Sequence, residues 1–307
     1  MTAALSDSEL RGSFTPLVTP LANGEVDYDQ FEVLVENQVT GGSQGVVVAG
    51  TSGEPSLLTL HERRRLLEAG VRAAAGRIPV VAATGCQSLV DTLELTTAAE
   101  RAGAAAVLVV TPYYSRPPQR GLIDYFQAVA ASTVLPLLIY HIPGRAAVDM
   151  KVETVQAISD RAPNLVGMKH AAVDFAYAGQ VMRRFGPSFR LFVGLEELSL
   201  PMLAIGAAGI MNAVGNIAPE RVAQLCAAVA NGDLIEARRI NDGLALLNEA
   251  VFYDTNPIPI KYMMKRLGVL ADNEHRLPMS RATPELECRL DAVLAELGLL
   301  TNANAPG

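Results

Sequence analysis

Short runs of apolar and β-branched residues alternate along the chain with longer segments in which apolar residues recur every three or four positions. The first pattern is typical of buried β-strands and the second of amphipathic helices. Strands are predicted at Gly12–Leu17, Gly45–Ala49, Ile78–Ala83, Ala105–Val110, Leu135–Tyr140, Leu165–Lys169, Leu191–Val193 and Gly209–Met211. Each is followed by a predicted helix, at Tyr28–Thr40, Thr59–Ala75, Leu89–Ala102, Gly121–Ser132, Lys151–Arg161, Phe175–Phe185, Glu197–Ile205 and Pro219–Ala230.

Regular alternation of strand and helix predicts parallel strands joined by right-handed crossovers. Eight such units close into a (β/α)8 TIM barrel, which is the fold class we expect. The alternative is an open, doubly wound sheet. Against it, no G-x-G-x-x-G follows the first strand and no G-x-x-x-x-G-K-[ST] occurs in the chain.

After the eighth unit the pattern changes, and residues 232–300 show helical periodicity only. The predicted helices are Leu234–Val251, Pro257–Leu267 and Glu285–Leu297. We therefore expect an α/β barrel over residues 1–231, a C-terminal helical extension over residues 232–300 and a frayed tail over residues 301–307.

Composition narrows the class of protein. Half of the 307 residues are apolar and 19% are charged, which is enough apolar material for a packed core. The net charge is −7 and no basic run occurs, so neither nucleic acid nor an anionic membrane is an expected partner. No apolar run approaches the roughly 18 residues of a membrane helix. Three cysteines without a CxxC pair, and a polar N-terminus unlike a signal peptide, predict a cytoplasmic location.

Lysine is rare, and one lysine has an unusual position. Only four of the 25 basic residues are lysines: Lys151, Lys169, Lys261 and Lys265. Lys169 closes an apolar strand, where burial favours the neutral amine. A neutral amine is a nucleophile toward carbonyl groups and can form a Schiff base. The alternative is a lysine that extends to solvent or pairs with Glu196 or Glu54. The other three lie on predicted helices, so we do not expect them at the barrel mouth.

Active sites of such barrels lie at the carboxyl ends of the strands, and several polar residues fall there. Tyr140 ends the strand before Lys169, and a phenol can act as a general acid or base. Thr51 and Ser52 follow the second strand in a glycine-flanked turn that suits a carboxylate. Arg145 could bind a carboxylate with its forked donors. Taken singly, each also fits a structural role: a core tyrosine, an ordinary turn or a surface arginine.

Two other kinds of function remain open on these residues. His141, His170 and Glu196 follow three successive strands, and two imidazoles with a carboxylate could bind a metal. We expect no metal and no other cofactor, because no tight ligand spacing occurs and Lys169 would have no role. The second alternative is a barrel that binds a keto acid without catalysis. It would leave the tyrosine and hydroxyl groups beside Lys169 unexplained.

Several motifs together resemble those of the dihydrodipicolinate synthase / N-acetylneuraminate lyase superfamily. In order they are Gly50-Thr51-Ser52-Gly53-Glu54, Thr111-Pro112-Tyr113-Tyr114, Tyr140-x-x-Pro143-x-Arg145, Gly167-x-Lys169 and Asn256-Pro257-Ile258-Pro259-Ile260-Lys261. The likeness extends from about residue 12 to residue 300. It implies a class I lyase, in which Lys169 condenses with the keto group of pyruvate or another 2-keto acid.

The resemblance also implies roles for neighbouring residues. Tyr140 matches the general acid/base, and Thr51 matches the hydroxyl that relays protons to a second tyrosine. Tyr114 matches that second tyrosine, which family members insert from the neighbouring subunit of a tight dimer. A homo-oligomer built as a dimer of dimers, a homotetramer, is therefore expected.

For substrate binding, the resemblance assigns Ser52 to the pyruvate carboxylate and the backbone at Gly194 and Ile210 to the lining of the site. Arg145 matches the arginine that binds the carboxylate of aspartate semialdehyde in the synthase branch, which serves lysine biosynthesis. Sialic acid lyases lack this arginine. A small-molecule substrate pair, pyruvate and an aldehyde, is thus expected.

The chain departs from the family pattern at three places. His141 replaces an asparagine, His170 an acidic residue, and Leu195–Glu196 an Asp-Asp pair. Because all three follow strand ends, we expect them at the mouth, in contact with the substrate. The alternative that they favour is a catabolic aldolase or dehydratase acting on a sugar acid or an aromatic 2-oxo acid.

Overall fold

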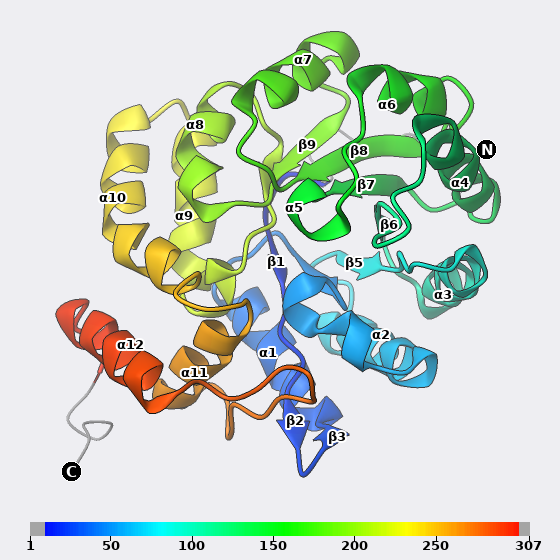
Figure 1. Ribbon diagram of the computed structural model, residues 1–307. Coiled ribbons are helices and arrows are strands. Elements are labelled where there is room, and N and C mark those ends of the chain that lie inside the picture. The colour runs from blue at the N-terminus through cyan, green and yellow to red at the C-terminus, as the bar shows by residue number, and fades with distance from the viewer. Residues whose placement is uncertain (1–9, 301–307) are drawn as a thin grey trace.

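The computed structural model describes residues 10–300 and contains a closed barrel of parallel strands surrounded by helices (Figure 1). The barrel closes in the order β1, β10, β9, β8, β7, β6, β5, β4. The strands are β1 (Gly12–Pro16), β4 (Gly45–Val48), β5 (Val80–Ala83), β6 (Ala106–Val110), β7 (Leu137–His141), β8 (Leu165–His170), β9 (Arg190–Val193) and β10 (Gly209–Ile210). This arrangement confirms the predicted (β/α)8 barrel. Residues 1–9 and the predicted frayed tail, residues 301–307, lie outside the described residues.

The helices between the strands also follow the sequence pattern. They are α1 (Tyr28–Thr40), α2 (Leu60–Ala74), α3 (Leu89–Ala102), α4 (Gln119–Ala131), α6 (Val152–Ser159), α7 (Phe175–Phe185), α8 (Ser199–Ala204) and α9 (Pro219–Ala230). The sequence pattern did not predict the hairpin of β2 (Leu21–Ala22) and β3 (Glu25–Val26) or the short helix α5 (Pro143–Ala146). Both are too short for hydrophobic periodicity to reveal.

Three helices follow the barrel: α10 (Leu234–Ala250), α11 (Ile258–Arg266) and α12 (Pro284–Glu296). The first packs against α8 and α9, and the other two pack against each other (Figure 1). The predicted domain boundary at residue 231 stays a prediction. Among residues 10–300 no helix is both long enough and apolar enough to cross a membrane.

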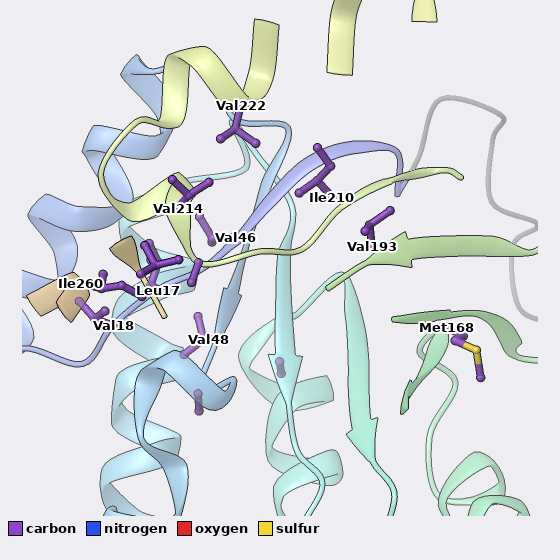
Figure 2. Close-up of a cluster of buried hydrophobic side chains, with 14 of the residues drawn as sticks. Leu17, Val18, Val46, Val48, Met168, Val193, Ile210, Val214, Val222 and Ile260 are labelled. Carbon is purple, nitrogen blue, oxygen red and sulfur yellow. The ribbon is translucent and has the colours of Figure 1, made fainter. Parts of the chain in front are cut away.

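Alternation of side chains along each strand produces two separate apolar cores. The inner core fills the barrel and includes Phe14 and Phe192, whose rings meet edge to face with centroids 5.3 Å apart. The outer core lies between strands and helices and receives Val46, Met168 and Ile210 (Figure 2). Because successive strand residues point to opposite faces, the neighbour of an inner residue belongs to the outer core.

A buried ion pair ties the helical extension to the barrel. Lys261 on α11 donates a hydrogen bond to Glu54, with 3.1 Å between Nζ and Oε2, and neither side chain is more than 6% exposed. His275 lies on the other carboxylate oxygen, with Nδ1 2.7 Å from Oε1. Glu54 therefore pairs with the extension, and the alternative in which it pairs with Lys169 is wrong.

Replacing Lys261 by methionine should lower the free energy of unfolding by about 3–5 kcal/mol, because the change leaves the Glu54 carboxylate buried without its ammonium partner. Urea unfolding at a fixed protein concentration measures this. Lys265→Met is the matched control, since that side chain on the same helix is 42% exposed. We expect the control to change stability by less than about 0.5 kcal/mol. Equal losses in the two variants would contradict a special role for the buried pair.

Candidate active site

The two groups that carry the predicted chemistry lie side by side inside the barrel. Tyr140 and Lys169 occupy register positions directly opposite each other on β7 and β8. The Lys169 amine lies 4.4 Å from the centre of the Tyr140 ring. Both residues are buried, with exposed fractions of 5% and 4%. The barrel therefore brings an amine and a phenol together in a largely dry environment.

A hydroxyl group completes this cluster. Thr51 opens a one-turn 3₁₀ helix, Thr51–Gly53, directly after β4. Its Oγ1 lies 3.1 Å from the Tyr140 hydroxyl, and either oxygen can donate the hydrogen bond. A proton leaving or reaching the phenol thus has an adjacent acceptor and donor.

The Thr51 and Tyr140 side of this cluster borders a cavity of about 250 Å³. Thr51, Tyr140, Arg145 and Asn256 contribute to its wall. Arg145 lies on α5 and is exposed, and no carboxylate or carbonyl of residues 10–300 pairs with its guanidinium. Ser52 is buried beside the cavity and accepts a hydrogen bond from the Asn256 amide, with 3.2 Å between Oγ and Nδ2. The wall therefore offers an available cation for an anionic substrate.

Space for the amine depends on a glycine. A Cβ atom at Gly194 would lie 2.9 Å from Cε of Lys169 and 2.7 Å from Cβ of Ala171. Gly194 thus touches the amine-bearing side chain through its backbone. Ile210 is different, since its side chain points into the outer core and only its backbone can face the barrel (Figure 2).

Tyr114 does not join the site of its own chain. Its side chain is 85% exposed and its backbone adopts a φ of 70°, in the left-handed region. The preceding residue, Tyr113, contributes to the cavity wall instead. The single chain therefore presents the Tyr114 ring outward, away from the Thr51 hydroxyl that the resemblance assigns to it.

The two histidines lie on the opposite side of the strands from the cavity. His141 and His170 follow the inward-facing Tyr140 and Lys169 by one position, so they point into the helix layer. Their exposed fractions are 1% and 2%, and both rings contact the ring of Tyr177 on α7. The expectation that they contact the substrate at the mouth is not met, because strand alternation turns them away from it.

Glu196, which was expected to contact the substrate, binds backbone amides instead. It is 1% exposed, and its Oε1 accepts hydrogen bonds from the backbone N–H groups of Ala213 and Val214, at 2.6 and 3.2 Å. Burial raises the pKa of its carboxyl group to about 7. Within the described part of the chain, no three His, Cys, Asp or Glu side chains are placed to hold a metal ion. The hypothetical set of two histidines and Glu196 is thus not assembled.

Sequence reasoning missed Arg63, a buried arginine in the cavity wall. It donates hydrogen bonds to the carbonyl of Ala83 at 2.7 Å and to Sγ of Cys86 at 2.9 Å. Its spacing from Leu66 and Leu67 places it on the buried face of α2. That spacing is visible in the sequence and could have identified an arginine directed inward.

Comparison with known proteins agrees with this geometry. The family model described as the dihydrodipicolinate synthetase family matches residues 9–297. A 4-hydroxy-tetrahydrodipicolinate synthase from Thermus thermophilus is 45% identical over 94% of this chain and 97% of its own length.

Solved structures show the same likeness. The dihydrodipicolinate synthase from Aquifex aeolicus superposes with a TM-score of 0.93 at 37% identity, covering 95% of this chain and all of its own. The chloride-inhibited dihydrodipicolinate synthase from Acinetobacter baumannii, complexed with pyruvate, superposes with a TM-score of 0.91 at 34% identity. The match covers 95% of this chain and 100% of that chain. With the family match spanning nearly the whole chain, this protein belongs to the dihydrodipicolinate synthetase family.

Proposed function

We propose that this protein is a 4-hydroxy-tetrahydrodipicolinate synthase, a class I lyase that joins pyruvate, held as a Schiff base on Lys169, to aspartate semialdehyde. The observation that carries the proposal is the buried cluster in which the Lys169 amine lies 4.4 Å from the Tyr140 ring and Thr51 lies 3.1 Å from the phenol oxygen. The relatives are named as synthases of this kind, and one of them was solved in complex with pyruvate, which supports a 2-keto acid as substrate.

The chemistry follows from the groups in the cluster. The neutral Lys169 amine attacks the keto carbon of pyruvate, and loss of water leaves a protonated imine. The imine withdraws electrons, so a C3 proton leaves and the resulting enamine attacks the aldehyde carbon. Tyr140 transfers protons to and from the reacting atoms, and Thr51 holds the phenol and passes protons onward.

The cavity wall supports the proposed second substrate. Arg145 can bind the carboxylate of aspartate semialdehyde with two parallel N–H donors, and Ser52 with the surrounding turn serves the carboxylate of pyruvate. The alternative, a catabolic aldolase or dehydratase acting on a sugar acid or aromatic 2-oxo acid, would use the same imine. It rested on His141, His170 and Leu195–Glu196. The two histidines face away from the cavity, and the Glu196 carboxylate accepts hydrogen bonds from backbone N–H groups.

A complete site needs a second subunit. The exposed Tyr114 ring fits insertion into the site of a partner subunit, where it would meet Thr51. We therefore infer a homo-oligomer assembled as a dimer of dimers, in a cytoplasmic setting.

Borohydride reduction in the presence of pyruvate tests the central claim. The wild-type chain should gain the mass of one reduced pyruvate adduct per subunit at Lys169, detected by mass spectrometry of the intact chain and its peptides. Lys169→Ala should gain none. Lys261→Arg is the matched control, since it keeps a cation in the buried pair and should be labelled like wild type. An unlabelled wild-type chain would falsify the Schiff-base mechanism.

Replacing Tyr140 by phenylalanine should lower turnover by about 10²–10⁴-fold, because the ring stays beside the amine while its acid/base group is lost. Pyruvate trapping should persist at an equal end point, although more slowly. Stopped assays of condensation, set beside the trapping yield, separate the two effects. If trapping and turnover fell by the same factor, Tyr140 would be a structural residue.

Arg145→Ala should raise KM for aspartate semialdehyde by about 10-fold or more, since a charge-assisted bidentate contact contributes about 1.5–3 kcal/mol. KM for pyruvate should stay within about twofold. The control is Arg120→Ala, an exposed arginine on α4 that lies outside the cavity wall. An unchanged KM for the aldehyde in Arg145→Ala would favour a different second substrate.

A further inference from the structure

Behind the cavity, on the outer face of the barrel, the two histidines form a single hydrogen-bonded pair. His141 and His170 are opposite each other in the β7–β8 register, one position beyond Tyr140 and Lys169. Their Nδ1 atoms are 3.1 Å apart, and their rings stack with centroids 5.2 Å apart. The pair therefore spans the two strands that carry the reacting groups.

The outer nitrogen of each ring also has a partner. The backbone N–H of Met150 donates to His141 Nε2 at 3.2 Å, and His170 Nε2 lies 3.2 Å from the carbonyl oxygen of Asp174. A backbone N–H can only donate and a carbonyl can only accept. The carbonyl contact determines that His170 carries a proton on Nε2.

The Asp174 carbonyl fixes the His170 end, because it requires a proton on His170 Nε2. A neutral His170 then accepts at Nδ1, so His141 donates from Nδ1 across the two strands. At the other end, His141 Nε2 either accepts from the Met150 N–H at 3.2 Å or, when protonated, donates to the Asp149 carboxylate at 2.8 Å. The hydrogen bond between the Nδ1 atoms is present in both arrangements.

A third proton changes only the His141 end of this chain of hydrogen bonds. The Asp149 carboxylate lies 2.8 Å from His141 Nε2, a contact that requires a proton on that nitrogen and displaces the Met150 N–H. The other titratable groups facing the pair are Asp174 and Tyr177 on the α7 side, with Glu153 on α6 acting on Tyr177. Burial lowers the pKa of both imidazoles, that of His170 to about 4, so the neutral arrangement holds near pH 7.

We propose that His141 and His170 are positioning residues, whose shared Nδ1 hydrogen bond holds the ends of β7 and β8 in the register that sets Tyr140 against Lys169. The inference rests on the proposed function, because it concerns the rate of that reaction. It concerns residues that touch neither the substrate nor the cavity. A displacement of about 1 Å between reacting groups can cost about 10²-fold in rate, so a hydrogen bond between the two strands can matter.

Two substitutions at one position separate the hydrogen bond from the ring. His141→Phe keeps an aromatic ring against Tyr177 and loses the bond to His170, whereas His141→Asn keeps a polar atom near the Nδ1 position and loses the ring. We expect kcat to fall about 10-fold or more in His141→Phe, with KM for pyruvate within about twofold. His141→Asn should retain kcat within about threefold of wild type.

Asn164→Ala is the matched control for loss of stability. Its amide donates to three backbone carbonyls, each at 3.1 Å, near the opposite ends of the same two strands. This variant should lower Tm without lowering kcat. A similar fall in kcat in Asn164→Ala, or full kcat in folded His141→Phe, would overturn the positioning role.

A measurement on the unmodified protein tests the pair if a variant does not fold. Nitrogen-15 NMR of the labelled imidazoles at pH 7.5 should show His141 protonated at Nδ1 and His170 at Nε2. Both rings protonated at Nε2 would overturn the inference. Borohydride trapping of the wild-type protein with pyruvate is the accompanying control. Absence of an adduct overturns the proposed function and with it the positioning role. A normal adduct together with the wrong tautomers overturns only the positioning role of the two histidines.

Discussion

The pairing of β7 with β8 is the constraint on which the rest of the site depends. In register, Tyr140 faces Lys169 and His141 faces His170, with one pair inside the barrel and the other outside. A shift of one residue in either strand would exchange the two faces, placing an imidazole in the barrel and the amine among the helices. The glycine at position 167 allows β8 to pack closely against both neighbouring strands, since a Cβ there would lie 2.2 Å from the Arg190 carbonyl oxygen on β9 and 2.8 Å from Cδ2 of Leu138 on β7.

The second requirement is that the loop after β4 be held in place from outside the barrel. Thr51 and Ser52 lie on one turn, and the next residue but one, Glu54, adopts a left-handed backbone with a φ of 54°. Such a conformation is costly for a residue other than glycine and persists where surrounding contacts compensate for it. Lys261 and His275 supply those contacts from the helical extension. The extension therefore holds in place the turn that carries the two hydroxyl groups.

Much of this architecture could be predicted from the sequence because strand and helix periodicities are strong in a barrel whose strands are buried on both faces. The same burial explains what could not be predicted. Runs such as Leu165–Met168 are apolar throughout, so the pattern does not reveal which residues point inward, and His170 was placed at the mouth although it faces the helices.

Ion pairs between residues far apart in the sequence also could not be predicted. Glu54 and Lys261 are 207 residues apart, and no local pattern links them. The asparagine-proline motif that contains Lys261 indicated the family but not that its lysine would be buried against the β4 loop. By contrast, Lys169 and Tyr140 could be identified because active sites of (β/α)8 barrels lie at the carboxyl ends of the strands.

The placement of the unusual residues changes how the family resemblance should be weighed. A departure from a family pattern argues for a new substrate only where the substituted side chain can reach the substrate. His141 and His170 reach each other, Tyr177 and the starts of two helices, and Glu196 reaches backbone amides. Three residues that border the cavity, Thr51, Tyr140 and Arg145, keep the types of the synthase branch. The two histidines and Glu196 thus bear on how the strands and loops are held rather than on which aldehyde is bound, whereas Leu195 packs against the inner core.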